Sequence, residues 1–167
     1  MTYFPDVNVW IALAAERHNL HYVARHWFSN LQDEKLTFCR LTQLGFLWLL
    51  TNKHVMQEEV MRPDEAWEVY RVLRLDRRIG YLNEPNELPE TWPAFTAGAL
   101  ISPNLWTDAY LCAFAHAGGL TLVTFDAKIP VTISSNTIET RLAFLVRIQR
   151  DSSFRGLAPT VWLETCA

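Results

Sequence analysis

The chain of 167 residues is 50% hydrophobic and 20% charged, a length and composition that suit one compact domain. Seven Trp and nine Phe exclude a disordered chain, and no apolar run reaches the roughly 18–20 residues that cross a bilayer. With 15 basic and 18 acidic side chains the net charge is −3, which argues against binding of a polyanion through bulk electrostatics.

The first half of the chain alternates short apolar runs with segments of helical periodicity. Tyr3 and Phe4 indicate a short buried strand that ends at Asp6. Further along, the pattern predicts helices over Val7–Arg17, Leu20–Leu31 and Leu41–Thr51, and a strand over Lys35–Cys39. Apolar residues run almost all round the third of these helices, which predicts that it is buried on every side.

Residues 56–90 are rich in carboxylates. Within them Asp64 is expected to cap a helix that reaches about Leu75. The candidate inward residues of this helix are Trp67, Tyr70, Val72 and Leu73. Residues 77–82 indicate a strand or an extended loop, and prolines at positions 85, 89 and 93 punctuate the segment that follows.

The clearest elements come next. A helix is predicted over Asn104–Ala117, ended by the Gly pair at 118–119, and a strand over Leu120–Asp126. After Lys128 we expect a strand over Val131–Ile133 and an amphipathic helix over Ile138–Ile148. Strands and helices that alternate in this way predict an α/β sandwich with a mostly parallel sheet.

Three aspartates occupy similar places in the predicted elements. Asp6 and Asp126 each end a strand, and Asp108 lies near the start of a helix. Carboxyl ends of parallel strands share one edge of a sheet, where acids repel one another unless a cation neutralises them. Carboxylate oxygens suit Mg²⁺ or Mn²⁺. Taken singly, Asp108 could equally be a helix N-cap and Asp126 a turn residue.

Other site classes find little support. The histidines at positions 18, 21, 26, 54 and 116 lack the spacing of a zinc site, no Ser stands in a nucleophile elbow, and no phosphate-binding Gly motif is present. Cys39, Cys112 and Cys166 are too widely spaced for a disulfide framework and indicate reduced thiols in a cytoplasmic protein. The metal-site pattern is therefore the strongest chemical signal in the sequence.

Three segments resemble a PIN-domain ribonuclease of the VapC toxin type: residues 4–13 (FPDVNVWIAL), 39–52 (CRLTQLGFLWLLTN) and 103–126 (PNLWTDAYLCAFAHAGGLTLVTFD). The resemblance implies a three-layer α/β/α PIN-like sandwich. It also implies a Mg²⁺- or Mn²⁺-dependent endoribonuclease, restrained by a cognate antitoxin and forming a homodimer. Residues 1–128 are expected to form the nuclease domain, and 129–167 a C-terminal extension that belongs to the same domain.

Carried onto this chain, the resemblance makes Asp6, Asp108 and Asp126 the catalytic metal-site residues. Asp6 and Asp108 would bind the cation directly, and Asp126 would complete the site directly or through a water. The side chains that would orient these ligands by hydrogen bonds are those of Asn8, Gln43 and Thr124. The cation would lower the pKa of a bound water, which attacks in line and leaves a 5′-phosphate and a 3′-hydroxyl.

Two departures from the family pattern matter. Gln43 stands where the family has its second acid, and an amide oxygen supplies no negative charge. Trp48 stands where many relatives carry Arg. Glu58 or Glu59 could compensate for the missing acid. The alternative function is a catalytically weakened PIN domain that binds RNA or a partner.

Overall fold

The computed structural model describes residues 1–97, 99 and 102–126, and the secondary structure of 141–144. The chain divides into two compact units. The N-terminal unit comprises Thr2 and residues 4–83, and the C-terminal unit comprises Met1, Tyr3 and the chain from Glu84 onward.

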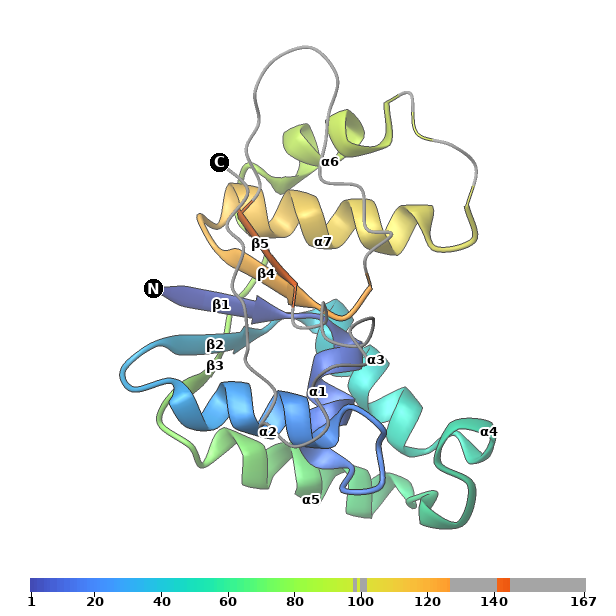
Figure 1. Ribbon diagram of the computed structural model, residues 1–167. Helices are drawn as coiled ribbons and strands as arrows, with labels where there is room; N and C mark the ends of the chain where they lie inside the picture. Colours follow the sequence, from blue (N-terminus) through green and yellow to red (C-terminus); the bar gives the residue numbers. More distant parts are fainter. Residues whose placement is uncertain (98, 100–101, 127–140, 145–167) are drawn as a thin grey trace, which may run out of the picture. The chain divides into compact units, whose positions relative to one another are not determined.

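The N-terminal unit alternates strands and helices (Figure 1). Strands β2 (Lys35–Phe38) and β3 (Ile79–Tyr81) run parallel, with Leu36 opposite Ile79 and Phe38 opposite Tyr81. Helix α1 (Val7–Ala14) packs against α2 (His21–Asn30) and α3 (Arg40–Leu50), and α5 (Pro63–Arg74) packs against α3. The elements, in chain order, are β1 (Thr2–Pro5), α1 (Val7–Ala14), α2 (His21–Asn30), β2 (Lys35–Phe38), α3 (Arg40–Leu50), α4 (Lys53–Met56), the 3₁₀ helix η1 (Gln57–Glu59), α5 (Pro63–Arg74) and β3 (Ile79–Tyr81).

An aromatic cluster joins four of these elements. The rings of Trp10 in α1 and Phe38 in β2 stack with their centroids 3.7 Å apart. Phe46 of α3 and Tyr70 of α5 lie against the same Phe38 ring, at centroid distances of 5.8 and 5.1 Å. All four side chains are buried, so the cluster fixes three helices on one strand through apolar burial.

Arg78 ties the end of α2 to the turn before β3. Its Nη1 donates to the carbonyl oxygens of Phe28 (3.1 Å) and Leu31 (2.8 Å). Its Nη2 lies 2.7 Å from Oδ2 of Asp76, and its guanidinium lies 3.9 Å from the centroid of the Phe28 ring. Hydrogen bonds from Arg78 are the main reason that the pKa of Asp76 falls to about 2.

This low pKa predicts a pH-dependent contribution to stability. Because the folded state lowers the pKa, the stabilisation is complete above the unfolded value and is lost as the pH falls through about 2. Partial exposure screens the pair, so we expect Asp76→Asn to lower the free energy of unfolding by about 1 kcal/mol at pH 7. Urea unfolding of both proteins at pH 7 and pH 2 checks this. A difference that stays equally large at pH 2 would contradict it.

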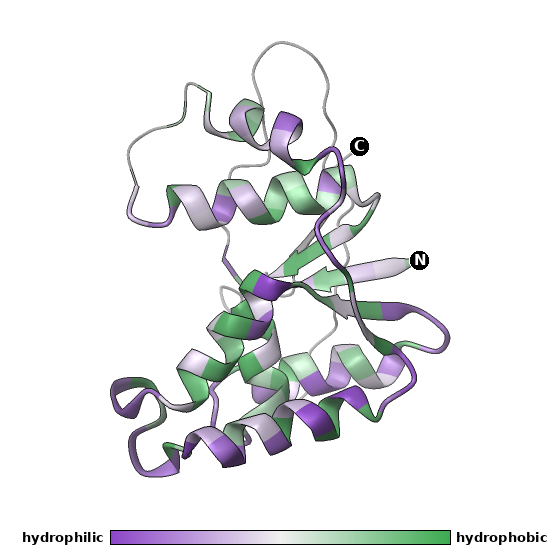
Figure 2. Cartoon of the chain, turned by 180° about the vertical axis from the view of Figure 1, so that it is seen from behind, coloured by the Kyte–Doolittle hydropathy of each residue, from purple (hydrophilic) through white to green (hydrophobic). Residues whose placement is uncertain are grey.

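The C-terminal unit contains α6 (Leu88–Thr96), α7 (Leu105–Ala117), β4 (Thr121–Thr124) and β5 (Arg141–Phe144). Helix α7 packs against α6 and β4, and β4 pairs in parallel with β5. Every residue from 109 to 115 is buried, in keeping with the mostly apolar colour of α7 in Figure 2. Gly119 takes a φ of +62°, which a glycine adopts at little cost and which reverses the chain between α7 and β4.

Most predicted elements are confirmed, including the strand that ends at Asp6, the helix over Asn104–Ala117 and the strand over Leu120–Asp126. Both described strand pairs are parallel, as predicted. Part of the segment punctuated by prolines forms α6, in which Pro89 stands in the first turn, where a missing N–H costs nothing, and Pro93 lies inside the helix. Within the described residues no helix has the length and apolarity to span a bilayer.

Several expectations for α3 and α5 are wrong. Helix α3 is not buried on every side, since Leu44 and Trp48 are 63% and 59% exposed. Asp64 does not cap α5. The cap is Arg62, whose backbone N–H donates to Oε2 of Glu65, and Pro63 opens the helix. The predicted inward residues Trp67 and Val72 are largely exposed as well, whereas Tyr70 is buried as predicted.

The helix expected over Ile138–Ile148 is also wrong, at least at residues 141–144, where the chain forms β5. A short apolar run fits helix and strand alike, and pairing with β4 decides between them. The strand expected over Val131–Ile133 lies outside the described residues.

Candidate functional site

Asp6 lies between the end of β1 and the start of α1. Its Oδ1 accepts from the backbone N–H of Val7 at 2.6 Å, and its Oδ2 accepts from Nδ2 of Asn8 at 2.8 Å. The side chain thus caps α1. These two bonds fix the orientation of the carboxylate. Asn8 therefore supports Asp6 by a direct hydrogen bond.

Gln43 is buried in α3, one turn after Arg40. Its Oε1 accepts from Nη1 of Arg40 at 2.6 Å. The amide oxygen that could have replaced the family's acid therefore already accepts a hydrogen bond from the guanidinium of Arg40. The guanidinium of Arg40 also lies 5.4 Å from the centroid of the Tyr81 ring, within the range of a cation–π contact.

A close approach links the start of α1 to the middle of α3. A Cβ atom on Gly45 would lie 2.8 Å from Cγ2 and 3.3 Å from Cγ1 of Val7, the first residue of α1. Glycine is required there because any side chain would displace Val7. The contact fixes the first turn of α1, and with it Asp6, against α3 two residues beyond Gln43.

Asp108 stands in the first turn of α7. It is not the N-cap of the helix, a role that belongs to Asn104, whose carbonyl oxygen accepts from the backbone N–H of Asp108 at 2.9 Å. An acid in the first turn is stabilised by the helix dipole. Two residues on, the hydroxyl of Tyr110 donates to Oε1 of Glu84 at 2.8 Å.

Thr124 and Asp126 lie at the end of β4. Thr124 is buried, and its Oγ1 accepts from the backbone N–H of Asp126 at 2.9 Å. This bond fixes the turn that carries Asp126, so the prediction of a turn residue and the prediction of a ligand are compatible.

The predicted site residues are divided between the two units. Asp6, Asn8 and Gln43 belong to the N-terminal unit. The other three, Asp108, Thr124 and Asp126, belong to the C-terminal unit. Within the described ranges no group of three His, Cys, Asp or Glu side chains is arranged as a metal site. Carboxylate oxygens, which Asp6, Asp108 and Asp126 each carry, are the ligands that Mg²⁺ and Mn²⁺ prefer.

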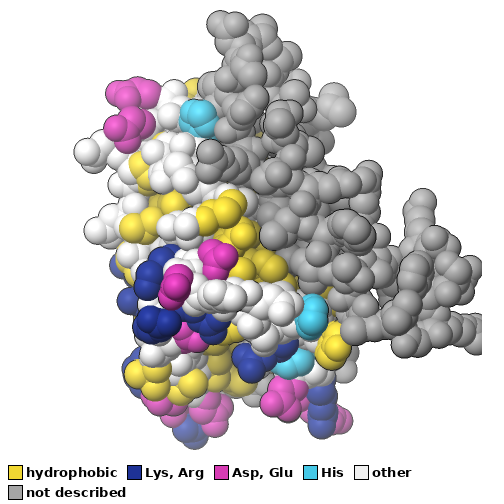
Figure 3. Space-filling view, turned by 60° about the vertical axis from the view of Figure 1, so that its left-hand side comes forward, with side chains coloured by type: hydrophobic (Ala, Val, Ile, Leu, Met, Phe, Trp, Pro, Cys, Tyr) yellow, Lys and Arg dark blue, Asp and Glu magenta, His cyan; other side chains and the backbone are white. Residues whose placement is uncertain are grey.

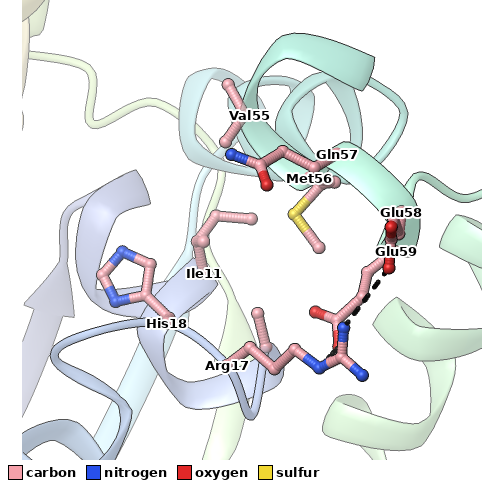
Figure 4. A pocket seen from close by; sticks show the side chains of 9 residues that line it. Ile11, Arg17, His18, Val55, Met56, Gln57, Glu58 and Glu59 are labelled. Carbon is pink, nitrogen blue, oxygen red and sulfur yellow. Dashed lines mark ion pairs between the residues drawn. The ribbon is translucent and has the colours of Figure 1, made fainter.

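Glu58 and Glu59 do not compensate for Gln43. They line a pocket of about 220 Å³ whose other walls include Ile11, Ala15 and His18, so the two carboxylates lie near the end of α1 opposite to Asp6 (Figure 4). Nε of Arg17 lies 3.0 Å from Oε1 of Glu59, and Nη1 of the same residue lies 4.0 Å from Oε2 of Glu58. These carboxylates therefore already have a cationic partner.

Several charges on the described surface are paired. On the face seen in Figure 3, Lys and Arg side chains lie beside Asp and Glu side chains. Arg62, Arg71 and Arg77 each form an ion pair with a nearby carboxylate. Any contact with a polyanion therefore depends on particular side chains, as the net charge of −3 implies.

Glu84 was not predicted as a site residue. The signal was present, because an acid follows β3 by a few residues much as Asp6 follows β1. The bond between Tyr110 and Glu84 holds this carboxylate against the helix that carries Asp108. Arg40 was not predicted as a site residue either, because nothing in the sequence spacing reveals its contact with Tyr81.

Comparisons with known proteins agree with the predicted resemblance. A family model described as PIN domain matches residues 3–132. Ribonuclease VapC41 of Mycobacterium tuberculosis is 40% identical over 126 residues, which cover 72% of this chain and 86% of the relative. A sequence identity of 40% over this length is high enough for two proteins to share a fold.

Solved structures give the same fold. The structure of VapC20 from Mycobacterium tuberculosis, a toxin that cleaves the sarcin-ricin loop, has a TM-score of 0.57 at 17% identity and covers 76% of this chain and 92% of its own. VapBC2 from Rickettsia felis, bound to a DNA fragment from its promoter, has a TM-score of 0.54 at 12% identity, covering 77% and 90%. The predicted α/β/α PIN-like fold is thereby confirmed. The chain belongs to the PIN-domain family and, within it, to the VapC ribonucleases.

Proposed function

We propose that this protein is a divalent-metal-dependent endoribonuclease and the toxin component of a type II toxin–antitoxin module. The carrying observation is the 40% identity to ribonuclease VapC41 over most of the chain. Its support in the structure is the fixed orientation of Asp6 at the start of α1, where two hydrogen bonds hold the carboxylate.

We assign three carboxylates as ligands of Mg²⁺ or Mn²⁺: Asp6, Asp108 and Asp126. When bound, the cation would supply an activated water and neutralise charge on the phosphate. Asn8 holds Asp6 by its amide, and Thr124 holds the turn of Asp126 by its hydroxyl. We assign Gln43 no direct contact with the cation, because its oxygen accepts from Arg40.

The engaged amide of Gln43 also favours a second candidate function. Without a fourth acid, the protein could be a weakened nuclease that acts by binding RNA or a partner. The two functions differ in one respect, namely whether RNA is cleaved when a divalent cation is present.

We further propose a cognate antitoxin as partner, by analogy with the VapBC2 assembly of Rickettsia felis, and a homodimer. A cytoplasmic location suits the buried reduced thiols of Cys39 and Cys112. The nuclease domain would span residues 1–128, close to the end of the family match at residue 132, and residues 129–167 would belong to the same domain through the pairing of β5 with β4.

Incubation of the purified protein with total RNA tests the proposed function. We expect cleavage with Mg²⁺ or Mn²⁺, none with EDTA, and recovery when excess cation is added back. Cleavage that persists in EDTA would contradict the metal dependence. Binding of RNA without cleavage in either cation would favour the second candidate.

A further inference from the structure

Three side chains gather where β2 and β3 end. Phe38 and Tyr81 are register partners at the ends of these parallel strands. Cys39 follows β2, and Arg40 begins α3 directly after it. Arg40, Gln43 and Tyr81 therefore lie together at the carboxyl edge of the strand pair, the edge at which α/β proteins bind ligands.

Two contacts hold the guanidinium of Arg40. Its Nη1 donates to Oε1 of Gln43 at 2.6 Å, and the group lies 5.4 Å from the centroid of the Tyr81 ring. Gln43 is only 6% exposed and cannot easily move away. Arg40 itself is exposed. Two protein contacts therefore hold the guanidinium, and the side chain is still accessible to solvent.

The charge of Arg40 is not neutralised. Within the part of the chain that the structure describes, no carboxylate lies within ion-pair distance of Arg40, whereas Arg17, Arg62 and Arg71 each have at least one such partner. Arg40 is also the first residue of α3, where the helix dipole favours an anion over a cation. Helix stability therefore does not explain an arginine at this position.

We propose that Arg40 binds a phosphate group of the RNA substrate, and that Gln43 and Tyr81 position its guanidinium. This inference rests on the proposed function in taking RNA as the source of the phosphate. A guanidinium presents five N–H donors in a planar fork that matches phosphate oxygens. One of them is used by Gln43, and the others can bind the phosphate.

The proposal gives a reason for the amide at position 43. A neutral oxygen can hold Arg40 without cancelling its charge. A carboxylate at the same distance would form an ion pair with Arg40 and compete with the phosphate. Gln43 is therefore a positioning residue for a phosphate contact, in place of an acid that would serve the cation.

Binding of RNA in EDTA tests this without relying on cleavage. A fluorescein-labelled single-stranded RNA of about 12 nucleotides is titrated with the full chain, and anisotropy is followed between about 50 and 300 mM KCl, a roughly sixfold range over which the salt dependence of binding is measured. The variants are Arg40→Ala, Gln43→Met and Gln43→Glu. The matched control is Arg71→Ala, which removes the same charge from the exposed face of α5.

We expect Arg40→Ala to weaken binding roughly tenfold. We also expect the negative slope of log K against log salt to become shallower by about 0.7, the value for one lost phosphate contact to a single strand. Gln43→Met should keep the slope but weaken binding about threefold, since the charge remains and only its position is lost. Gln43→Glu should resemble Arg40→Ala. Arg71→Ala should leave the slope unchanged.

An unchanged slope in Arg40→Ala, or tighter binding by Gln43→Glu, would overturn the proposal. Failure of the proposed function gives a different pattern. If the wild type never cleaves RNA but the slope still falls in Arg40→Ala, the phosphate contact stands and the nuclease assignment falls. If the wild type cleaves RNA and Arg40→Ala binds like the control, only the phosphate contact falls. Circular dichroism of each variant confirms that it is folded.

Discussion

Asp6→Asn is expected to lower the rate of metal-dependent RNA cleavage by at least about 100-fold, the scale at which loss of one charged stabilising group is felt in an active site. The variant loses the negative charge that would bind the cation. It keeps an oxygen that can accept from the backbone N–H of Val7, because Asn caps a helix about as well as Asp does. The hydrogen bond to Asn8 is kept if the Asn8 amide flips, so that its oxygen accepts from the new side-chain amide at position 6.

The fold should therefore remain while activity is lost. We expect the midpoint of thermal unfolding to change by less than about 4 °C. Asp64→Asn, which removes an exposed carboxylate in the first turn of α5, is the matched control and should cleave RNA at the wild-type rate. Wild-type cleavage by Asp6→Asn would remove Asp6 from the metal site.

The second large effect is expected at Gly45. In an isolated helix Gly→Ala is favourable by about 1 kcal/mol. Here the added Cβ would lie 2.8 Å from Cγ2 of Val7, a stiff β-branched side chain, and overpacking of this kind costs about 1–3 kcal/mol. We expect Gly45→Ala to be net destabilising by about 1 kcal/mol and to reduce RNA cleavage about tenfold, because Val7 carries the displacement to Asp6.

A double-mutant cycle separates this mechanism from a general loss of stability. Val7→Ala removes both Cγ atoms that the new Cβ would meet. Val7→Ala with Gly45→Ala should therefore recover most of the stability and activity lost in Gly45→Ala, with a coupling energy of about 1–2 kcal/mol in urea unfolding. Additive effects would show that the contact between Gly45 and Val7 does not carry the loss.

Local signals predicted the elements that bear the aspartates. A buried strand followed by an acid gave Asp6, and β-branched alternation gave the strand before Asp126. These elements depend on short-range patterns, which a sequence carries directly. The family motifs then identified the residues of the proposed metal site, and the substitution of Asp6 described above tests that hypothesis.

Long-range contacts explain the failures. The apolar residues round α3 predicted burial, but the sequence does not say how many neighbours the helix has, and Leu44 and Trp48 remain exposed. Helix α5 begins at Pro63, and the bond from the backbone N–H of Arg62 to Glu65 sets the cap two residues earlier than expected from Asp64. The contact of Arg40 with Tyr81 joins residues 41 positions apart, so no local pattern could reveal it.

The end groups of the RNA fragments test the central claim most directly. Metal-assisted hydrolysis, with water as the attacking group, leaves a 5′-phosphate and a 3′-hydroxyl. Fragments made by the wild type in Mg²⁺ should therefore be substrates for ligation at both ends without prior treatment, and should be absent with Asp108→Asn. A 2′,3′-cyclic phosphate on the fragments, formed equally by Asp108→Asn, would contradict the account, because attack by the 2′-hydroxyl needs neither the cation nor the carboxylates.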